Sequence, residues 1–247
     1  MGVIVNTTAS SGPGQDRSRA YRPSAGWGVA LVAALTGSLL LVLGAPRLIA
    51  AFCALDARGV VWSVYAGTTV SPAELARASA GLATAEAWVP DGERAGDRSL
   101  LLLHQALLVP TPAEQTALRT AAEAAAVSAL SVAPVQPSVW ARLASLREQR
   151  HDLSGAVVAL RMSMLSGSFV PALMVPRVEQ GLRLLPVMDY ETRELLKRQM
   201  RLTWIANPEF LVGLSLRPDA GLLVREALAD LSQSELAQFQ RLHGNRP

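Results

Sequence analysis

Side chains that could bind a metal ion or transfer a proton are few and scattered along this chain. The three histidines are His104, His151 and His243, and none lies in an H-x-x-x-H or C-x-x-C spacing, which would bring ligands together. Cys53 is the only cysteine, so no intramolecular disulfide bond can form. The nucleophile motif G-x-S-x-G is absent from the sequence. We therefore expect no catalytic residues, no metal site and no cofactor, and a protein that is not an enzyme; an enzyme without local motifs is the alternative.

The residues that could still do chemistry have simpler structural interpretations. His104 lies in the apolar run LLLLHQALL, which is typical of a histidine in a helix core. His151 and Asp152 fall between two expected helices, where a carboxylate caps a helix more often than it catalyses a reaction. The charged residues between Glu191 and Arg198 are spaced as i,i+4 pairs on a solvated helix face.

The composition favours an all-α fold. Half of the residues are apolar but only 5% are aromatic, so the apolar residues are mainly Ala, Leu and Val, which suit helices better than a β-sandwich. Lys197 is the only lysine, an Arg bias that we interpret as typical of a GC-rich bacterial genome. The net charge of +3 includes +2 from the first 24 residues, and no basic stripe with aromatic partners is present. We expect no nucleic-acid partner and no small-molecule substrate.

Residues 25–46 carry no charged, carboxylate or amide side chain and predict a transmembrane helix. As a helix, this stretch would extend roughly 33 Å, enough for a hydrocarbon core of about 30 Å. A cleaved signal peptide is the alternative, but the apolar run is longer than the usual h-region. We expect Pro46 to end or kink the helix. Small residues in the span, Ala33, Ala34, Gly37, Ser38 and Gly44, would allow another helix to approach.

The anchor divides the chain into four expected parts. Residues 1–24 form a disordered cytoplasmic tail, 25–46 the anchor, 47–70 a membrane-proximal linker, and 71–247 a helical-repeat domain. Arginines that precede the anchor favour a cytoplasmic N-terminus, which places the domain on the periplasmic side of a bacterial inner membrane. Within the linker, we expect a short apolar and aromatic group to lie against the bilayer surface: Val60, Val61, Trp62 and Tyr65.

Capping boxes mark several helix starts. Ser71, Thr111 and Ser232 are each followed three residues later by Glu, and the first two also have Pro at the first helical position. We predict loops at 91–97 and 133–137, and a helix end at Asn207-Pro208. The predicted helices cover about 72–88, 97–108, 112–132, 137–150, 153–166, 173–184, 190–205, 218–230 and 233–243.

Residues 137–171 contain a pattern of large and small residues across two expected helices. Large residues at Trp140 and Leu143 fill a gap, and a small residue at Ala144 lets the helices approach. The second helix places Ala156 and Leu160 opposite them. This pattern resembles a tetratricopeptide repeat, a helix hairpin of about 34 residues. A single repeat does not bury its own apolar face, so we expect neighbouring helices to stack on it in an irregular tetratricopeptide-like array.

The resemblance implies a protein-binding groove on the first helix of the hairpin. Five residues would face it: Ser138, Ala141, Ser145, Glu148 and Gln149. The alternative is that neighbouring helices cover this face. We expect a membrane-anchored scaffold that binds a protein partner, an organisation similar to that of proteins in envelope or polysaccharide-export assemblies. The alternative function is an accessory single-pass subunit that contacts its complex mainly through the anchor helix.

Overall fold

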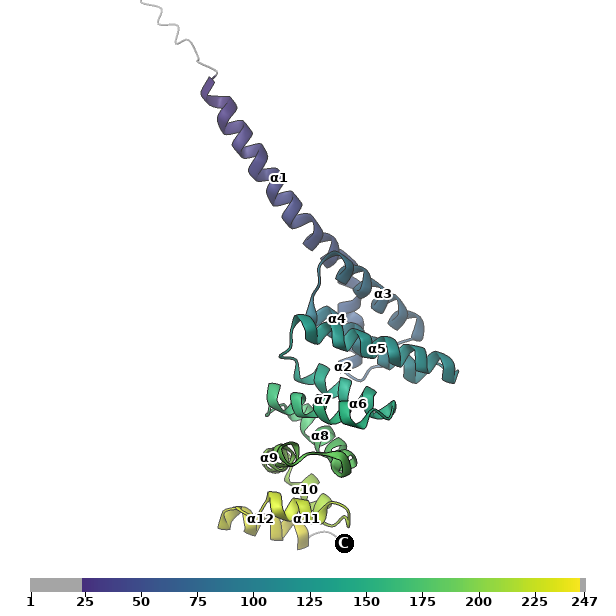
Figure 1. The fold of residues 1–247 in the computed structure, drawn as a ribbon, viewed down its shortest axis with the longest axis vertical. Coiled ribbons are helices and arrows are strands. Elements are labelled where there is room, and N and C mark those ends of the chain that lie inside the picture. Colours follow the sequence, from purple (N-terminus) through teal and green to yellow (C-terminus); the bar gives the residue numbers. More distant parts are fainter. Residues whose placement is uncertain (1–23, 245–247) are drawn as a thin grey trace, which may run out of the picture. The chain divides into compact units, whose positions relative to one another are not determined.

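The computed structural model describes residues 24–244, which form helices and no strand (Figure 1). The prediction of an all-α fold with one long apolar N-terminal helix is confirmed. The expected tail lies outside the described residues, except for Ser24. The helices are α1 (Ser24–Cys53), α2 (Leu55–Tyr65), α3 (Pro72–Trp88), α4 (Gly92–Leu108), α5 (Pro112–Val132), α6 (Pro137–Gln149), α7 (Leu153–Ser166), α8 (Pro171–Leu184), η1 (Leu185–Val187), α9 (Tyr190–Ala206), α10 (Pro208–Ser215), α11 (Gly221–Ala227) and α12 (Gln233–Gly244).

The chain divides into two units, Met1–Ala45 and Pro46–Pro247. In the first unit, the leucine and valine side chains of α1 are exposed. The segment Trp27–Cys53 is long and apolar enough to cross a membrane, by length and composition alone. The helix does not end at Pro46, which lies inside α1.

In the second unit, the expected linker contains a helix that packs on the domain. Ala57 of α2 is buried in a cluster with Leu75, Ala78 and Leu82 of α3 and Leu101 of α4. Val60 and Val61 pack against this cluster, whereas Trp62 and Tyr65 are exposed. The compact unit therefore starts before Ser71 and includes α2.

The predicted loop at 91–97 is wrong, because α4 starts at Gly92. Asp91 caps the helix by accepting a hydrogen bond from the Arg94 amide at 2.9 Å. A Cβ atom on Gly92 would lie 2.6 Å from the Ala133 Cβ, and one on Gly96 would lie 2.9 Å from the Val139 side chain. These glycines therefore permit close helix approach and do not form a turn.

The other helix starts show that a capping sequence does not guarantee a capping bond. The Ser71 hydroxyl accepts from the Glu74 amide and the Glu74 carboxylate accepts from the Ser71 amide, a complete capping box. Ser232 and Glu235 form the same pair. Thr111 makes no side-chain capping bond, although α5 does start directly after it.

From α3 to α11, each helix packs on the next one in the chain, and α12 packs on α10; the helices follow one another in chain order down the unit (Figure 1). A stripe of fully buried alanines on α5, Ala122, Ala125, Ala126 and Ala129, allows α4 and α6 to pack closely on it. The largest apolar cluster extends from α4 to α11 and includes Leu143, Leu160, Leu196 and Leu211. This packing is compatible with a helical repeat. The predicted helix at 218–230 is shorter, Gly221–Ala227, and α10 precedes it.

Candidate functional site

The hairpin of α6 and α7 positions the first candidate surface. Leu143, Ala144, Ala156 and Leu160 are buried, with at most 2% of their surface exposed. Trp140 is only partly buried, and its indole N–H donates to the Pro134 carbonyl at 2.7 Å. The indole ring therefore covers the edge of the core and fixes the chain that enters α6.

The turn between these two helices depends on two polar residues. His151 adopts a left-handed backbone conformation with φ of 62°, which reverses the chain. Asp152 then caps α7, because its carboxylate accepts a hydrogen bond from the Gly155 amide at 2.9 Å. This bond lowers the pKa of Asp152. Asp152 thus has the capping role that its position predicts.

The five residues of the predicted groove follow one side of α6. Ser138 and Gln149 are exposed, and Ala141, Ser145 and Glu148 are partly buried. The Ser145 hydroxyl donates to the Ala141 carbonyl at 3.2 Å, so it is satisfied within the helix. The two middle residues, Ala141 and Ser145, have small side chains that project little from the helix. We call these five residues the α6 face.

Glu148 connects the α6 face to α8. Its carboxylate accepts hydrogen bonds from Gln180 at 3.0 Å and from Arg183 at 2.6 and 3.1 Å. Burial alone would raise the pKa of Glu148, but the bonds from Arg183 and Gln180 outweigh burial and the pKa is lowered. The charge of Glu148 is therefore already compensated by α8.

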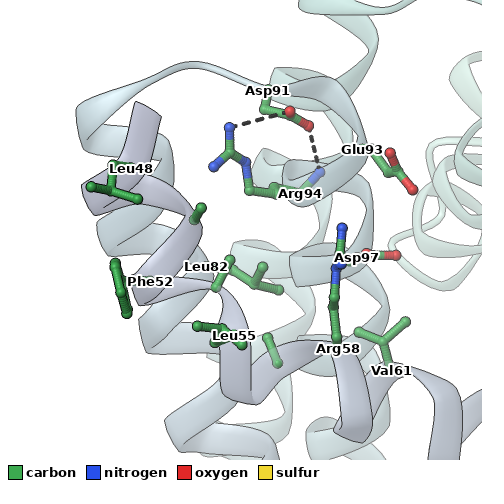
Figure 2. Close-up of a pocket in the computed structure, with 13 residues that line it drawn as sticks. Leu48, Phe52, Leu55, Arg58, Val61, Leu82, Asp91, Glu93, Arg94 and Asp97 are labelled. Carbon is green, nitrogen blue, oxygen red and sulfur yellow. Dashed lines mark hydrogen bonds and ion pairs between the residues drawn. The ribbon is translucent and has the colours of Figure 1, made fainter. Parts of the chain in front are cut away.

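A second surface, which the sequence did not indicate, is a hollow lined by the end of α1 together with α2, α3 and α4. Its volume is about 420 Å³, and all its lining residues belong to the unit Pro46–Pro247. Figure 2 shows Leu48, Phe52 and Leu55 on one side of this hollow and the charged residues of α4 on the other. Leu48, Phe52 and Leu55 are each more than half exposed.

The hollow continues into another of about 620 Å³, lined by α2, α4 and α6. The two hollows share Arg58, Val61, Glu93 and Asp97, and we call them together the α2–α4 groove. The second hollow is also lined by Trp62, Tyr65, Ser138 and Arg142. Ser138 therefore belongs both to the α6 face and to the edge of this groove.

The charged residues of the groove differ in how they are compensated. Arg94 forms an ion pair with Asp91 at 3.2 Å, and Arg142 donates to the Gly96 carbonyl at 2.7 Å. Burial lowers the pKa of Arg142, although Tyr65 and Asp97 act against it. Among the residues that the structure describes, Arg58 and Glu93 have no ion-pair partner.

Asp97 is the most strongly perturbed carboxyl group in the groove. Burial is the main cause, and the nearby Glu93 and Asp91 carboxylates add to it, so that its pKa is raised to about 6 in spite of Arg142. This carboxyl group is therefore about half protonated near pH 6. Such groups occur in structural networks and in binding sites alike.

Sequence reasoning missed this groove because α2 and the start of α4 were expected to be irregular. Its charged residues come from three helices, at positions 58, 91–97 and 142, and no local spacing connects them. Within residues 24–244, no group of three or more His, Cys, Asp or Glu side chains is arranged to hold a metal ion. His104 of α4 is only partly buried.

Comparison with protein-family models, curated proteins and solved structures finds no match to this chain. The likeness to a tetratricopeptide repeat thus depends on the residue pattern and on the packing of neighbouring helices.

Proposed function

We propose that this protein is a single-pass membrane scaffold whose helical unit holds a partner protein next to a bacterial inner membrane. The observation that carries the proposal is the combination, in one chain, of an exposed apolar helix and a compact stack of helices. The α6 face offers this partner a surface of small side chains. Stacked helical repeats commonly use such surfaces to bind other proteins.

The test exchanges residues 24–45 of the full chain for an unrelated apolar helix of the same length. We expect the exchanged protein to retain its co-purifying partner in mild detergent, because the contact is made by the unit Pro46–Pro247. A second variant, Ser145→Arg with Gln149→Arg, places bulk and charge on the α6 face and should lose the partner. Val158→Arg is the matched control, because Val158 is exposed on α7.

The alternative function is an accessory subunit held mainly by α1. A hollow on α1 favours it, because Gly28, Ala33 and Gly37 line this surface and let another helix approach closely. Among the described residues, no atom outside the helix's own backbone lies within 4 Å of the position of a Cβ on Gly28 or Gly37. Loss of the partner after the helix exchange, with no effect of the two arginine substitutions, would establish this alternative and reject the scaffold.

We further propose that the helical unit faces the periplasm, as the arginines before the span predict. Two fusions after residue 247 test the orientation: one reporter is active only in the cytoplasm and the other only outside it. Activity of the outside reporter is expected. Activity of the cytoplasmic reporter alone would reverse the orientation without affecting the scaffold proposal.

A further inference from the structure

The α2–α4 groove combines an apolar side with unpaired charges of both signs. Its apolar side is formed by Leu48, Phe52 and Leu55, which are exposed in the unit. Its polar side presents Arg58 from α2, with Glu93 and Asp97 from α4. The two hollows, of about 420 and 620 Å³, are of the size that holds small organic ligands.

Arg58 and Glu93 line the same groove without forming an ion pair with each other. In Figure 2, the Arg58 side chain extends from α2 toward α4, where Glu93 and Asp97 lie. Arg94 lies on the same lining, but its guanidinium group is paired with Asp91 at 3.2 Å and its Nε is buried, so it leaves Arg58 as the unpaired cation among the described residues of the groove. Unpaired charges of opposite sign on one groove suit a ligand that itself carries both charges.

The apolar side indicates the rest of this ligand. Leu48 and Phe52 belong to the segment Trp27–Cys53 that is apolar enough to cross a membrane. If this segment spans the bilayer, as proposed above, its last residues lie near the level of the lipid headgroups. A lipid can therefore enter this groove directly from the bilayer, and we expect a lipid to occupy it in preference to a soluble ligand.

We propose that the α2–α4 groove binds a zwitterionic phospholipid with a primary amine, such as phosphatidylethanolamine. The phosphate accepts hydrogen bonds from Arg58, the ammonium group donates to Glu93 and Asp97, and an acyl chain lies along Leu48, Phe52 and Leu55. The amine distinguishes this lipid from phosphatidylcholine, whose quaternary ammonium group donates no hydrogen bond. An acidic lipid such as phosphatidylglycerol carries no cation for Glu93.

This inference depends on the proposed membrane anchoring, and the test separates the two. The full chain is reconstituted into nanodiscs of phosphatidylcholine alone, or of phosphatidylcholine mixed with phosphatidylethanolamine or with phosphatidylglycerol. Native mass spectrometry then measures which lipids stay bound to the chain after it is released from the nanodisc. Failure of the chain to enter any nanodisc would overturn the anchoring and, with it, this inference.

When the chain enters the nanodiscs, we expect it to retain phosphatidylethanolamine about tenfold more than either of the other two lipids. A difference of this size corresponds to one hydrogen bond between charged groups. Glu93→Gln should remove this preference. Arg58→Gln should instead lower the retention of all three lipids, because each carries a phosphate, and Arg225→Gln, at an exposed position on α11, should change neither. Equal retention of all three lipids by the unaltered chain would overturn the inference. Loss of a co-purifying protein in the Glu93 and Arg58 variants, without a change in bound lipid, would overturn it in favour of a protein in the groove.

Discussion

The guanidinium group of Arg177 lies buried against Ser163, and its Nε donates to the Ser163 hydroxyl at 3.0 Å. The same guanidinium donates to the carbonyls of Ser163 and Gly167 at 2.6 and 2.8 Å, and to the Gln199 side chain at 3.3 Å. All these acceptors are neutral. Ser163 in turn donates to the Pro137 carbonyl at 2.7 Å, so that one polar network connects α6, α7, α8 and α9.

Replacement of Arg177 by methionine should destabilise the helical unit strongly. Burial already lowers the pKa of Arg177 to about 10, which reflects the cost of placing this charge in the core. Its removal, however, leaves several acceptors buried without a donor, and we expect the free energy of unfolding to fall by about 3 kcal/mol. Chemical denaturation followed by circular dichroism measures this change. Arg225→Met, at an exposed arginine, should have little effect; equal stability of the two variants would show that the network is unimportant.

The two proline-containing cap sequences should respond differently to alanine. Ser71→Ala removes a hydroxyl that accepts from the Glu74 amide at 3.3 Å, and we expect a loss of about 1 kcal/mol in the free energy of unfolding. Thr111→Ala should cost much less, because the Thr111 side chain makes no capping bond. Thermal melting of both variants tests the difference. A larger effect at Thr111 than at Ser71 would contradict the capping assignment.

Trp140 and Leu143, which the repeat pattern treats alike, should differ in their contribution to stability. Leu143 is 2% exposed, so Leu143→Ala should lower the free energy of unfolding by about 2–5 kcal/mol. Trp140→Phe keeps most of the ring contact and loses the hydrogen bond to the Pro134 carbonyl. We expect the loss of this bond to lower the free energy of unfolding by about 1 kcal/mol. Denaturation curves of the two variants measure both effects. A greater loss for Trp140→Phe would place the tryptophan at the centre of the core.

Asp97 should make the stability of the unit depend on pH. Its pKa is raised from 3.8 to about 6 in the folded chain, chiefly by burial. Between these two values the unfolded chain has released the proton and the folded chain has kept it. The free energy of unfolding therefore falls as the pH rises through this window, and the loss persists above it.

The variant Asp97→Asn removes this ionisation. It should be more stable than the unaltered chain at about pH 8, with a difference that shrinks at about pH 3, where the carboxyl group is mostly protonated in both states. Asp230→Asn, at a side chain that is 91% exposed, is the control for a general charge effect. If the difference in stability between Asp97→Asn and the unaltered chain were the same at both pH values, the raised pKa of Asp97 would be contradicted.

Local sequence signals predicted most of the helices but not the α2–α4 groove. The capping box and proline mark the start of α3, and proline marks the start of α5, because these residues act within one turn of the chain. Gly92 and Gly96 suggested a loop, although their missing side chains in fact permit contact with Ala133 and Val139. Such a role depends on residues about 40 positions away in the sequence, for which a local pattern carries no information. The pairing of Glu148 with Arg183 is of the same kind.

In the function that we propose, the helical unit contacts the partner protein through the α6 face. Photo-crosslinking in intact cells tests it most directly, with a photoreactive amino acid placed at Ser145 or Gln149 of α6, at Val158 of α7, or at Val32 of α1. We predict a discrete higher-mass adduct from the two α6 positions and none from Val158. An adduct from Val32 alone, with none from Ser145 or Gln149, would contradict the account and assign the contact to the span.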